Sequence, residues 1–180
     1  MVNIKEEVEK LINKFPTARV ISIVQEISEA DFELQRYKHL SRNALGGAVG
    51  IITTPSQEII LVERTGMHAG WALPGGTVEN GEDFQEAYER EIVEEIGIQL
   101  YDTSLFVLEK KEFRSPAGKS LDFLLAVFNS HTNIYNLPEA TSDAISEGLA
   151  SKIFHARHLP EKMILSDRNK IKMFMERAPR

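Results

Sequence analysis

The chain has 180 residues, of which 42% are hydrophobic and 27% charged, and its formal net charge is −6. This balance is typical of a globular domain, and the acidity disfavours a broad nucleic-acid-binding surface. Cysteine is absent, which excludes disulfides, thiolate metal sites and a cysteine nucleophile. No apolar run reaches the length of a membrane span, so we expect a cytoplasmic protein with no membrane contact.

The first 43 residues predict one helix and one strand. Ile4, Val8, Leu11 and Ile12 recur at helical spacing within residues 3–14, and Pro16 stops that helix. Residues 18–27 are rich in β-branched side chains and predict a strand. Residues 28–43 are polar and mixed, and they fit either a short helix or a returning strand.

The middle of the chain predicts a hairpin, a glycine turn and a helix. Strands are expected over 44–54 and 58–64, followed by a loop over 65–70 and a Pro-Gly-Gly turn at Gly75. A helix should begin near Glu82 or Asp83, with Asn80 as its N-cap, and end at Gly97.

The last third predicts three strands and a terminal helix. The expected elements are strands over 105–113, 120–129 and 151–155, a long loop over 131–145, and a helix over 167–177 with Ile171, Phe174 and Met175 facing inward. Strands combined with a mid-chain and a terminal helix predict α/β layers around a mixed sheet.

Three glutamates of the mid-chain helix lie where a core face is expected. Glu91, Glu94 and Glu95 are at offsets of 0, +3 and +4, which places them within an arc of roughly 100°. Glu91 and Glu95 fall inside the arc of apolar residues. Carboxylates aimed inward are costly unless a positive group meets them. A divalent cation would meet them, and Mg²⁺ prefers such oxygen ligands.

The spacing around these glutamates resembles the Nudix box of the MutT-like Nudix hydrolase family. The matching residues are Gly76, Glu82, Arg90-Glu91-Ile92, Glu94-Glu95 and Gly97-Ile98. The box covers 23 residues, and a weaker resemblance runs from about Ala44 to Phe174. It implies an α/β/α sandwich in residues 44–180, a Nudix hydrolase domain. Residues 1–43 are then an extension for dimerisation or substrate specificity, with a homodimer as the expected assembly.

The resemblance also implies a reaction. Such enzymes hydrolyse a diphosphate linkage in a small nucleoside diphosphate derivative, of the ADP-ribose, nucleotide-sugar or (d)NTP type, by attack of water on phosphorus with Mg²⁺ or Mn²⁺. Glu91, Glu94 and Glu95 match the metal-binding positions, which the Gly75 carbonyl often joins. A glutamate at the position of Glu91 orients or deprotonates water in some members. Arg90 matches a residue that fixes a glutamate rotamer, and Glu82 matches a supporting position.

A further acidic ligand should come from the loop before the strand at Ile153. Glu147 matches best the place where some relatives carry an extra catalytic, metal-binding glutamate; Glu139 and Asp143 are the alternatives.

Substrate contacts are less sharply indicated. Arg64 fits either a phosphate contact or an ion pair, and Trp71 fits packing or base stacking. Phe113 and Arg114 are candidates for holding a base or a phosphate, against ordinary core and surface roles. The competing function is a binding module that senses ADP-ribose, but such modules usually carry a damaged box. The isomerase branch of the fold uses a cysteine, which this chain lacks.

Overall fold

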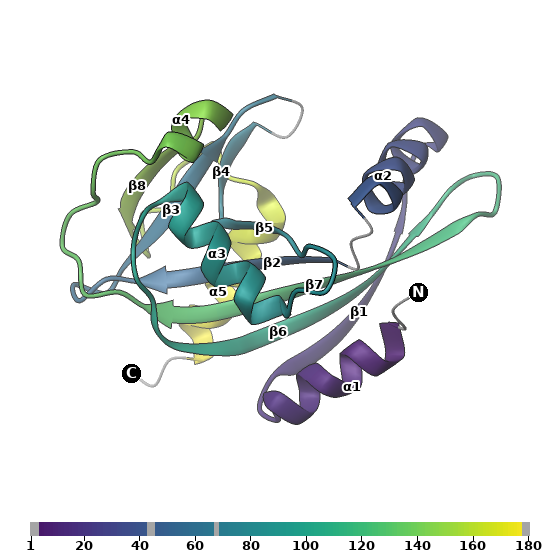
Figure 1. The fold of residues 1–180 in the computed structure, drawn as a ribbon, viewed down its shortest axis with the longest axis horizontal. Helices are drawn as coiled ribbons and strands as arrows, with labels where there is room; N and C mark the ends of the chain where they lie inside the picture. Colours follow the sequence, from purple (N-terminus) through teal and green to yellow (C-terminus); the bar gives the residue numbers. More distant parts are fainter. Residues whose placement is uncertain (1–3, 43–45, 67–68, 178–180) are drawn as a thin grey trace. The chain divides into compact units, whose positions relative to one another are not determined.

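The computed structural model describes residues 4–42, 46–66 and 69–177, and its elements are drawn in Figure 1. The chain divides into two compact units, one of residues 1–49, 76–87 and 104–128, the other of residues 50–75, 88–103 and 129–180. Several elements run through both units, among them the helix that carries the three glutamates. The expected boundary between residues 43 and 44 lies outside the described residues.

The first unit begins with α1 (Ile4–Lys14), β1 (Arg19–Glu26) and α2 (Glu29–Arg42). The predictions for 3–14 and 18–27 are confirmed, and the undecided segment 28–43 is a helix. Ser28 starts α2, because its hydroxyl accepts a hydrogen bond from the Asp31 amide at 3.1 Å. Leu11, fully buried, anchors α1.

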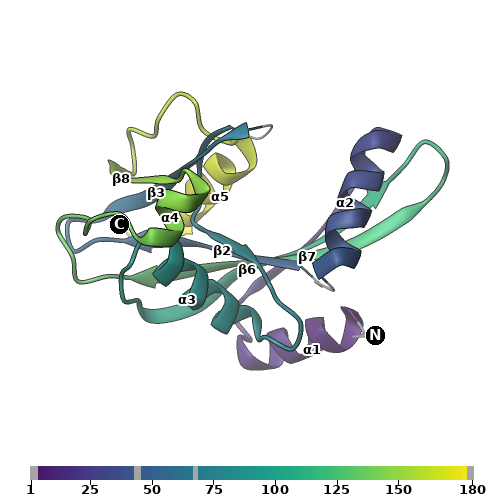
Figure 2. The same ribbon diagram turned by 45° about the horizontal axis from the view of Figure 1, so that its top comes forward.

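The sheet of the first unit follows the order β1-β6-β7-β2. β6 (Tyr101–Arg114) and β7 (Ser120–His131) are joined by a tight turn, seen beside α2 in Figures 1 and 2. β1 pairs with β6 in parallel, from Arg19 opposite Val107 to Glu26 opposite Arg114. The predicted strands over 105–113 and 120–129 are confirmed, although both are longer than expected.

The second unit is built on β3 (Glu58–Arg64), which has two strand neighbours besides β2 (Gly46–Thr53). β4 (Gly70–Ala72) and β8 (Ala150–His155) both pair with β3 in antiparallel fashion. Ile59, Ile60, Leu61 and Val62 of β3 are all fully buried, so this strand forms the centre of the core. The sheet is mixed, as predicted, because it contains the parallel pair β1–β6 and antiparallel pairs such as β3–β8.

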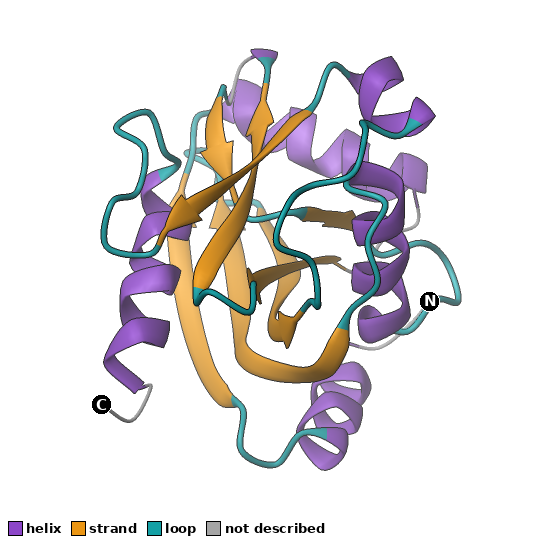
Figure 3. Cartoon of the chain, turned by 90° about the vertical axis from the view of Figure 1, so that its left-hand side faces the viewer, coloured by secondary structure: helices purple, strands orange, loops and turns teal. Residues whose placement is uncertain are grey.

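The remaining elements are β5 (Gly75–Thr77), α3 (Phe84–Glu95), α4 (Ser142–Glu147) and α5 (Leu165–Arg177). α5 is the helix that leads to the C-terminal label in Figure 3. Among the described residues, no helix has both the length and the apolar character needed to cross a bilayer.

Three local predictions are wrong. Asn80 does not cap α3: Asp83 does, since its carboxylate accepts the Gln85 amide at 2.8 Å while Glu86 accepts the Asp83 amide at 3.1 Å. The stretch 131–145 is not all loop, because α4 begins within it. Met175 does not face inward; it is 39% exposed, whereas Ile171 is buried.

A close approach of β2 to α3 explains one of the glycines of that strand. A Cβ atom on Gly50 would lie 2.2 Å from the hydroxyl oxygen of Tyr88. The Tyr88 side chain is fully buried, and its hydroxyl is 2.8 Å from the Ser130 hydroxyl of β7. Only glycine leaves room for this ring, which fixes where the glutamate-bearing turns of α3 lie in the second unit.

Candidate active site

The carboxylate-bearing part of α3 belongs wholly to the second unit. Tyr88, Ile92 and Ile96 are buried, as the helical period predicts. Glu95 shares their face and is only 5% exposed. The side chains of Glu91 and Glu94 are 17% and 41% exposed. The three carboxylates therefore run from the buried side of the helix toward solvent.

Glu95 joins the end of α3 to the glycine turn. Its Oε2 accepts the amide of Gly75 at 2.8 Å, and its Oε1 lies 3.0 Å from Nη2 of Arg64. The same Nη2 donates to the Gly75 carbonyl at 2.5 Å. Arg64 is thus in an ion pair, one of the two roles expected for it. The buried carboxylate has the positive partner that burial demands.

Burial controls the protonation of two of the glutamates. It raises the pKa of Glu95 to about 7, against the opposing effects of the Arg64 charge and the Gly75 amide. Burial also raises the pKa of Glu91, partly offset by the charge of Arg90 and its hydrogen bond. A carboxyl group that titrates near neutrality can hold or release a proton under ordinary conditions.

Arg90 lies between the other two glutamates. Its Nη1 is 3.1 Å from Oε1 of Glu91 and 2.9 Å from Oε2 of Glu94. One guanidinium group therefore holds two carboxylates of the same helix face. This is the geometry that the expected organising role of Arg90 requires.

The oxygen atoms of this region suit a hard divalent cation. Mg²⁺ and Mn²⁺ take carboxylate and carbonyl oxygens as ligands, and this region offers three carboxylates and the Gly75 carbonyl. The Gly75 carbonyl and Glu95 share the guanidinium group of Arg64. Within residues 4–42, 46–66 and 69–177, no three acidic or histidine side chains converge on one point that could hold a metal ion. The arginines hold the carboxylates in their present rotamers, so ligation requires side-chain movement.

Glu147 is the last residue of α4 and is exposed. The segment that carries it is fixed to α3 by Thr141, whose hydroxyl donates to the Glu94 carbonyl and accepts the Ala144 amide at 3.0 Å as the N-cap of α4. Thr141 was missed by sequence reasoning. The signal was present, because Thr-Ser-Asp is a typical helix N-terminus. Glu139 and Asp143 are exposed residues of the same segment.

Trp71 packs within the second unit. Its ring stands edge-on to Phe154 of β8, with ring centroids 4.7 Å apart. Its amide donates a hydrogen bond to the Lys162 carbonyl, and its carbonyl accepts one from the Ile164 amide. These contacts account for the packing role expected for Trp71.

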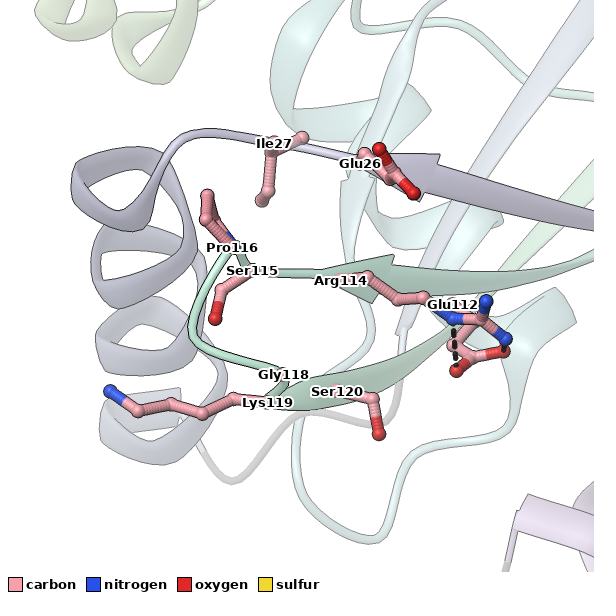
Figure 4. Close-up of a pocket in the computed structure, with 9 residues that line it drawn as sticks. All are labelled: Glu26, Ile27, Glu112, Arg114, Ser115, Pro116, Gly118, Lys119 and Ser120. Atoms are coloured by element: carbon pink, nitrogen blue, oxygen red, sulfur yellow. Dashed lines mark hydrogen bonds and ion pairs between the residues drawn. The ribbon is translucent and has the colours of Figure 1, made fainter.

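Phe113 and Arg114 belong to the first unit. The Phe113 ring lies 6.3 Å from that of Phe123, and the Arg114 guanidinium pairs with Glu112 at 2.8 and 3.0 Å. Arg114 lines a cavity of about 470 Å³ at the β6–β7 turn, shown in Figure 4 with Glu26, Ile27, Glu112, Ser115, Pro116, Gly118, Lys119 and Ser120. The substrate role of both residues stays a prediction.

Comparison with known proteins matches this chain to one family model, the NUDIX domain, over residues 44–165. Over 72 residues the chain is 40% identical to the 8-oxo-dGTP diphosphatase of Escherichia coli (strain K12), covering 38% of this chain and 54% of that protein. Over 51 residues it is 49% identical to a protein of Bacillus subtilis (strain 168), covering 28% of this chain and 34% of the relative. The chain thus spans about a third to about half of the length of these curated relatives.

Solved structures share the fold. A MutT NUDIX hydrolase from Burkholderia pseudomallei has a TM-score of 0.53 at 24% identity, with 70% of this chain and 94% of that chain covered. A MutT protein from Methanosarcina mazei Go1 has a TM-score of 0.55 at 18% identity, with 76% and 96% covered.

Proposed function

Because the chain belongs to the NUDIX domain family, we propose that it is a divalent-metal-dependent pyrophosphohydrolase. Its substrate would be a nucleoside diphosphate derivative, and the reaction would be attack of water on one phosphorus of the diphosphate linkage. The observation that carries the proposal is the buried Glu95 carboxylate, tied to the Gly75 turn and flanked on its helix by Glu91 and Glu94. A core position is an expensive place for a carboxylate that has only a structural role.

We assign metal binding, proton transfer and positioning to different residues of the site. Gly75 through its carbonyl, Glu95, Glu91 and Glu94 would hold Mg²⁺ or Mn²⁺, which when bound supplies charge neutralisation of the phosphates and an acidified water. Glu91, whose pKa is raised by burial, is our candidate for accepting the proton of the attacking water. Arg90 positions Glu91 and Glu94 through its two contacts.

Three further assignments concern residues outside α3. Glu147, at the end of the short helix that Thr141 anchors to α3, is our candidate for an additional acidic group. Residues 1–43 are proposed to serve dimerisation or substrate choice, and a homodimer is the assembly we would look for. Arg64, Trp71, Phe113 and Arg114 remain the candidates for substrate contacts.

The substrate class we favour is an oxidised purine nucleoside triphosphate. The 8-oxo-dGTP diphosphatase of Escherichia coli shares 40% identity with this chain over 72 residues. ADP-ribose and nucleotide sugars are the alternative substrate classes, since each contains a diphosphate linkage that the same reaction would cleave.

The test is a substrate panel with purified protein. The protein is incubated with 8-oxo-dGTP, dGTP, ADP-ribose and a nucleotide sugar, with Mg²⁺, with Mn²⁺ and with a chelator. We expect metal-dependent release of a nucleoside monophosphate and the strongest activity on 8-oxo-dGTP. Tight ligand binding without turnover on any substrate would instead support the binding module.

A further inference from the structure

Arg64 contacts two oxygen groups that the proposed function needs for another purpose. It is the last residue of β3, where it pairs with Gly70 of β4, and its side chain is 30% exposed. A single nitrogen, Nη2, lies 2.5 Å from the Gly75 carbonyl oxygen and 3.0 Å from Oε1 of Glu95. The guanidinium group thus stands between the backbone of the glycine turn and the buried end of α3.

These two oxygens are also suitable ligands for a hard divalent cation. The carbonyl and the carboxylate share one hydrogen-bond donor, so they are neighbours, and both are ligand types that a hard divalent cation takes. A guanidinium group and a divalent cation repel each other at such separations, most strongly where the site is shielded from water. Glu95 is 5% exposed, so screening by solvent is weak there.

We propose that Arg64 competes with the divalent cation for the Gly75 carbonyl and the Glu95 carboxylate, and leaves this ion pair when metal binds. This inference rests on the proposed function, since it assumes that these oxygens are metal ligands. Arg64 keeps the turn and the helix in place by neutralising Glu95, and it sets the metal concentration at which the site fills. Once displaced, its planar guanidinium is available to a phosphate of the substrate.

The bonds of Arg90, a neighbouring arginine, stay within one helix, whereas those of Arg64 join separate segments. Arg90 holds Glu91 and Glu94, both on its own helix. Arg64 bridges a strand end, a turn and a helix. Its departure would therefore change what links these three segments.

The first experiment measures metal affinity without turnover. Mn²⁺ is titrated by calorimetry into the wild type, Arg64→Gln and Arg168→Gln, each checked for folding by thermal melting. Arg168 is a matched charge control, because it lies in the same unit and its guanidinium group donates to a backbone carbonyl, that of Pro160. Arg64→Gln should bind Mn²⁺ on the order of tenfold more tightly than the wild type, with Arg168→Gln within about twofold. Equal or weaker binding by folded Arg64→Gln overturns the competition.

The second experiment uses the wild type and so does not depend on a variant that folds. The Nε–Hε resonance of Arg64, assigned by its loss in Arg64→Lys, is followed by NMR as Mg²⁺ is added. We expect it to shift and to saturate together with metal binding. A resonance that stays unchanged at saturating Mg²⁺ means that Arg64 keeps its partners, and the proposal is then wrong.

These outcomes are separable from the fate of the proposed function. If metal binds with the expected Arg64 response but no substrate is hydrolysed, the proposed hydrolase function is wrong and the proposed competition is supported. If substrate is hydrolysed but the Arg64 resonance does not respond to metal, the hydrolase function is supported and the competition is wrong. Absence of Mn²⁺ binding by both the wild type and Arg64→Gln would refute the competition whatever the activity.

Discussion

The amide of Gly75 donates a hydrogen bond of 2.8 Å to the carboxylate of Glu95. The two residues are 20 positions apart in the chain, one at the start of β5 and the other at the end of α3. Because Glu95 is buried, this bond fixes the orientation of the turn relative to the helix terminus. It brings the backbone carbonyl of Gly75 close to a carboxylate of the helix.

Asp83, not Asn80, determines where α3 begins. Replacing Asp83 with alanine removes the acceptor for the Gln85 amide and the ion pairs to Lys10 and Lys14 at 3.6 and 3.3 Å. We expect a loss of about 1 kcal/mol in the free energy of unfolding, measured in urea. Asn80→Ala is the control and should change the free energy by less than about 0.5 kcal/mol. The reverse order would show that the cap is Asn80.

Gly50 should tolerate no side chain. Gly50→Ala places a methyl group 2.2 Å from the Tyr88 hydroxyl, in a site where the ring is fully buried. We expect the free energy of unfolding to fall by about 3 kcal/mol or more. Gly118 has a positive φ of 78°, and a Cβ atom there would meet nothing within 4 Å apart from its chain neighbours, so Gly118→Ala should cost only about 1 kcal/mol. Comparable small losses for both would show that β2 and α3 are less closely packed.

The pH dependence of stability should carry the signature of Glu95. Its pKa is about 7 in the folded protein because of burial, above the value of about 4.3 in an unfolded chain. The folded state therefore binds the extra proton, so this contribution is fully present below about pH 4.3 and is lost as the pH rises through 7.

The measurement compares wild type with Glu95→Gln in chelator. Between pH 5 and pH 8 the wild type should lose about 2 kcal/mol more of its unfolding free energy than Glu95→Gln, which cannot ionise. Parallel pH profiles for the two proteins would mean that Glu95 titrates normally.

Arg90 should affect catalysis more than folding. Arg90→Gln frees Glu91 and Glu94 from their shared contact, so kcat should fall by about tenfold to a hundredfold while the KM for substrate changes little. The partly exposed ion pairs of Arg90 with these two glutamates are worth about 1 kcal/mol or less to stability. Arg90→Lys, which keeps the charge but not the planar guanidinium group, should recover part of kcat. A large loss of stability with unchanged kcat would assign Arg90 a purely structural role.

Local chemistry made much of this molecule predictable. The apolar period of α3 located its buried face, and the run of β-branched residues located β1 and β3. The inward position of Glu95 followed from the same period. Segment 28–43 could not be decided, because its pattern of apolar residues fits a helix and a strand equally well.

Contacts between distant segments were not predictable. That Arg64 would meet both Gly75 and Glu95, or that Thr141 would donate to the Glu94 carbonyl, depends on how β3, the turn and α3 are brought together. Asn80 and Asp83 both have side chains able to cap a helix, and only the observed hydrogen bonds distinguish them. No local period contains that information.

The most direct test of the account is turnover of 8-oxo-dGTP, with Mg²⁺, by the wild type, Glu94→Gln, Glu95→Gln and Glu89→Gln. Glu89, on the same helix, is the control, because Arg64, Gly75 and Arg90 are the groups that hold the other three glutamates. We predict that Glu94→Gln and Glu95→Gln lose about a hundredfold to ten-thousandfold in kcat, while Glu89→Gln stays within about threefold of the wild type. Full activity of folded Glu94→Gln and Glu95→Gln would contradict the assignment of the active site to α3.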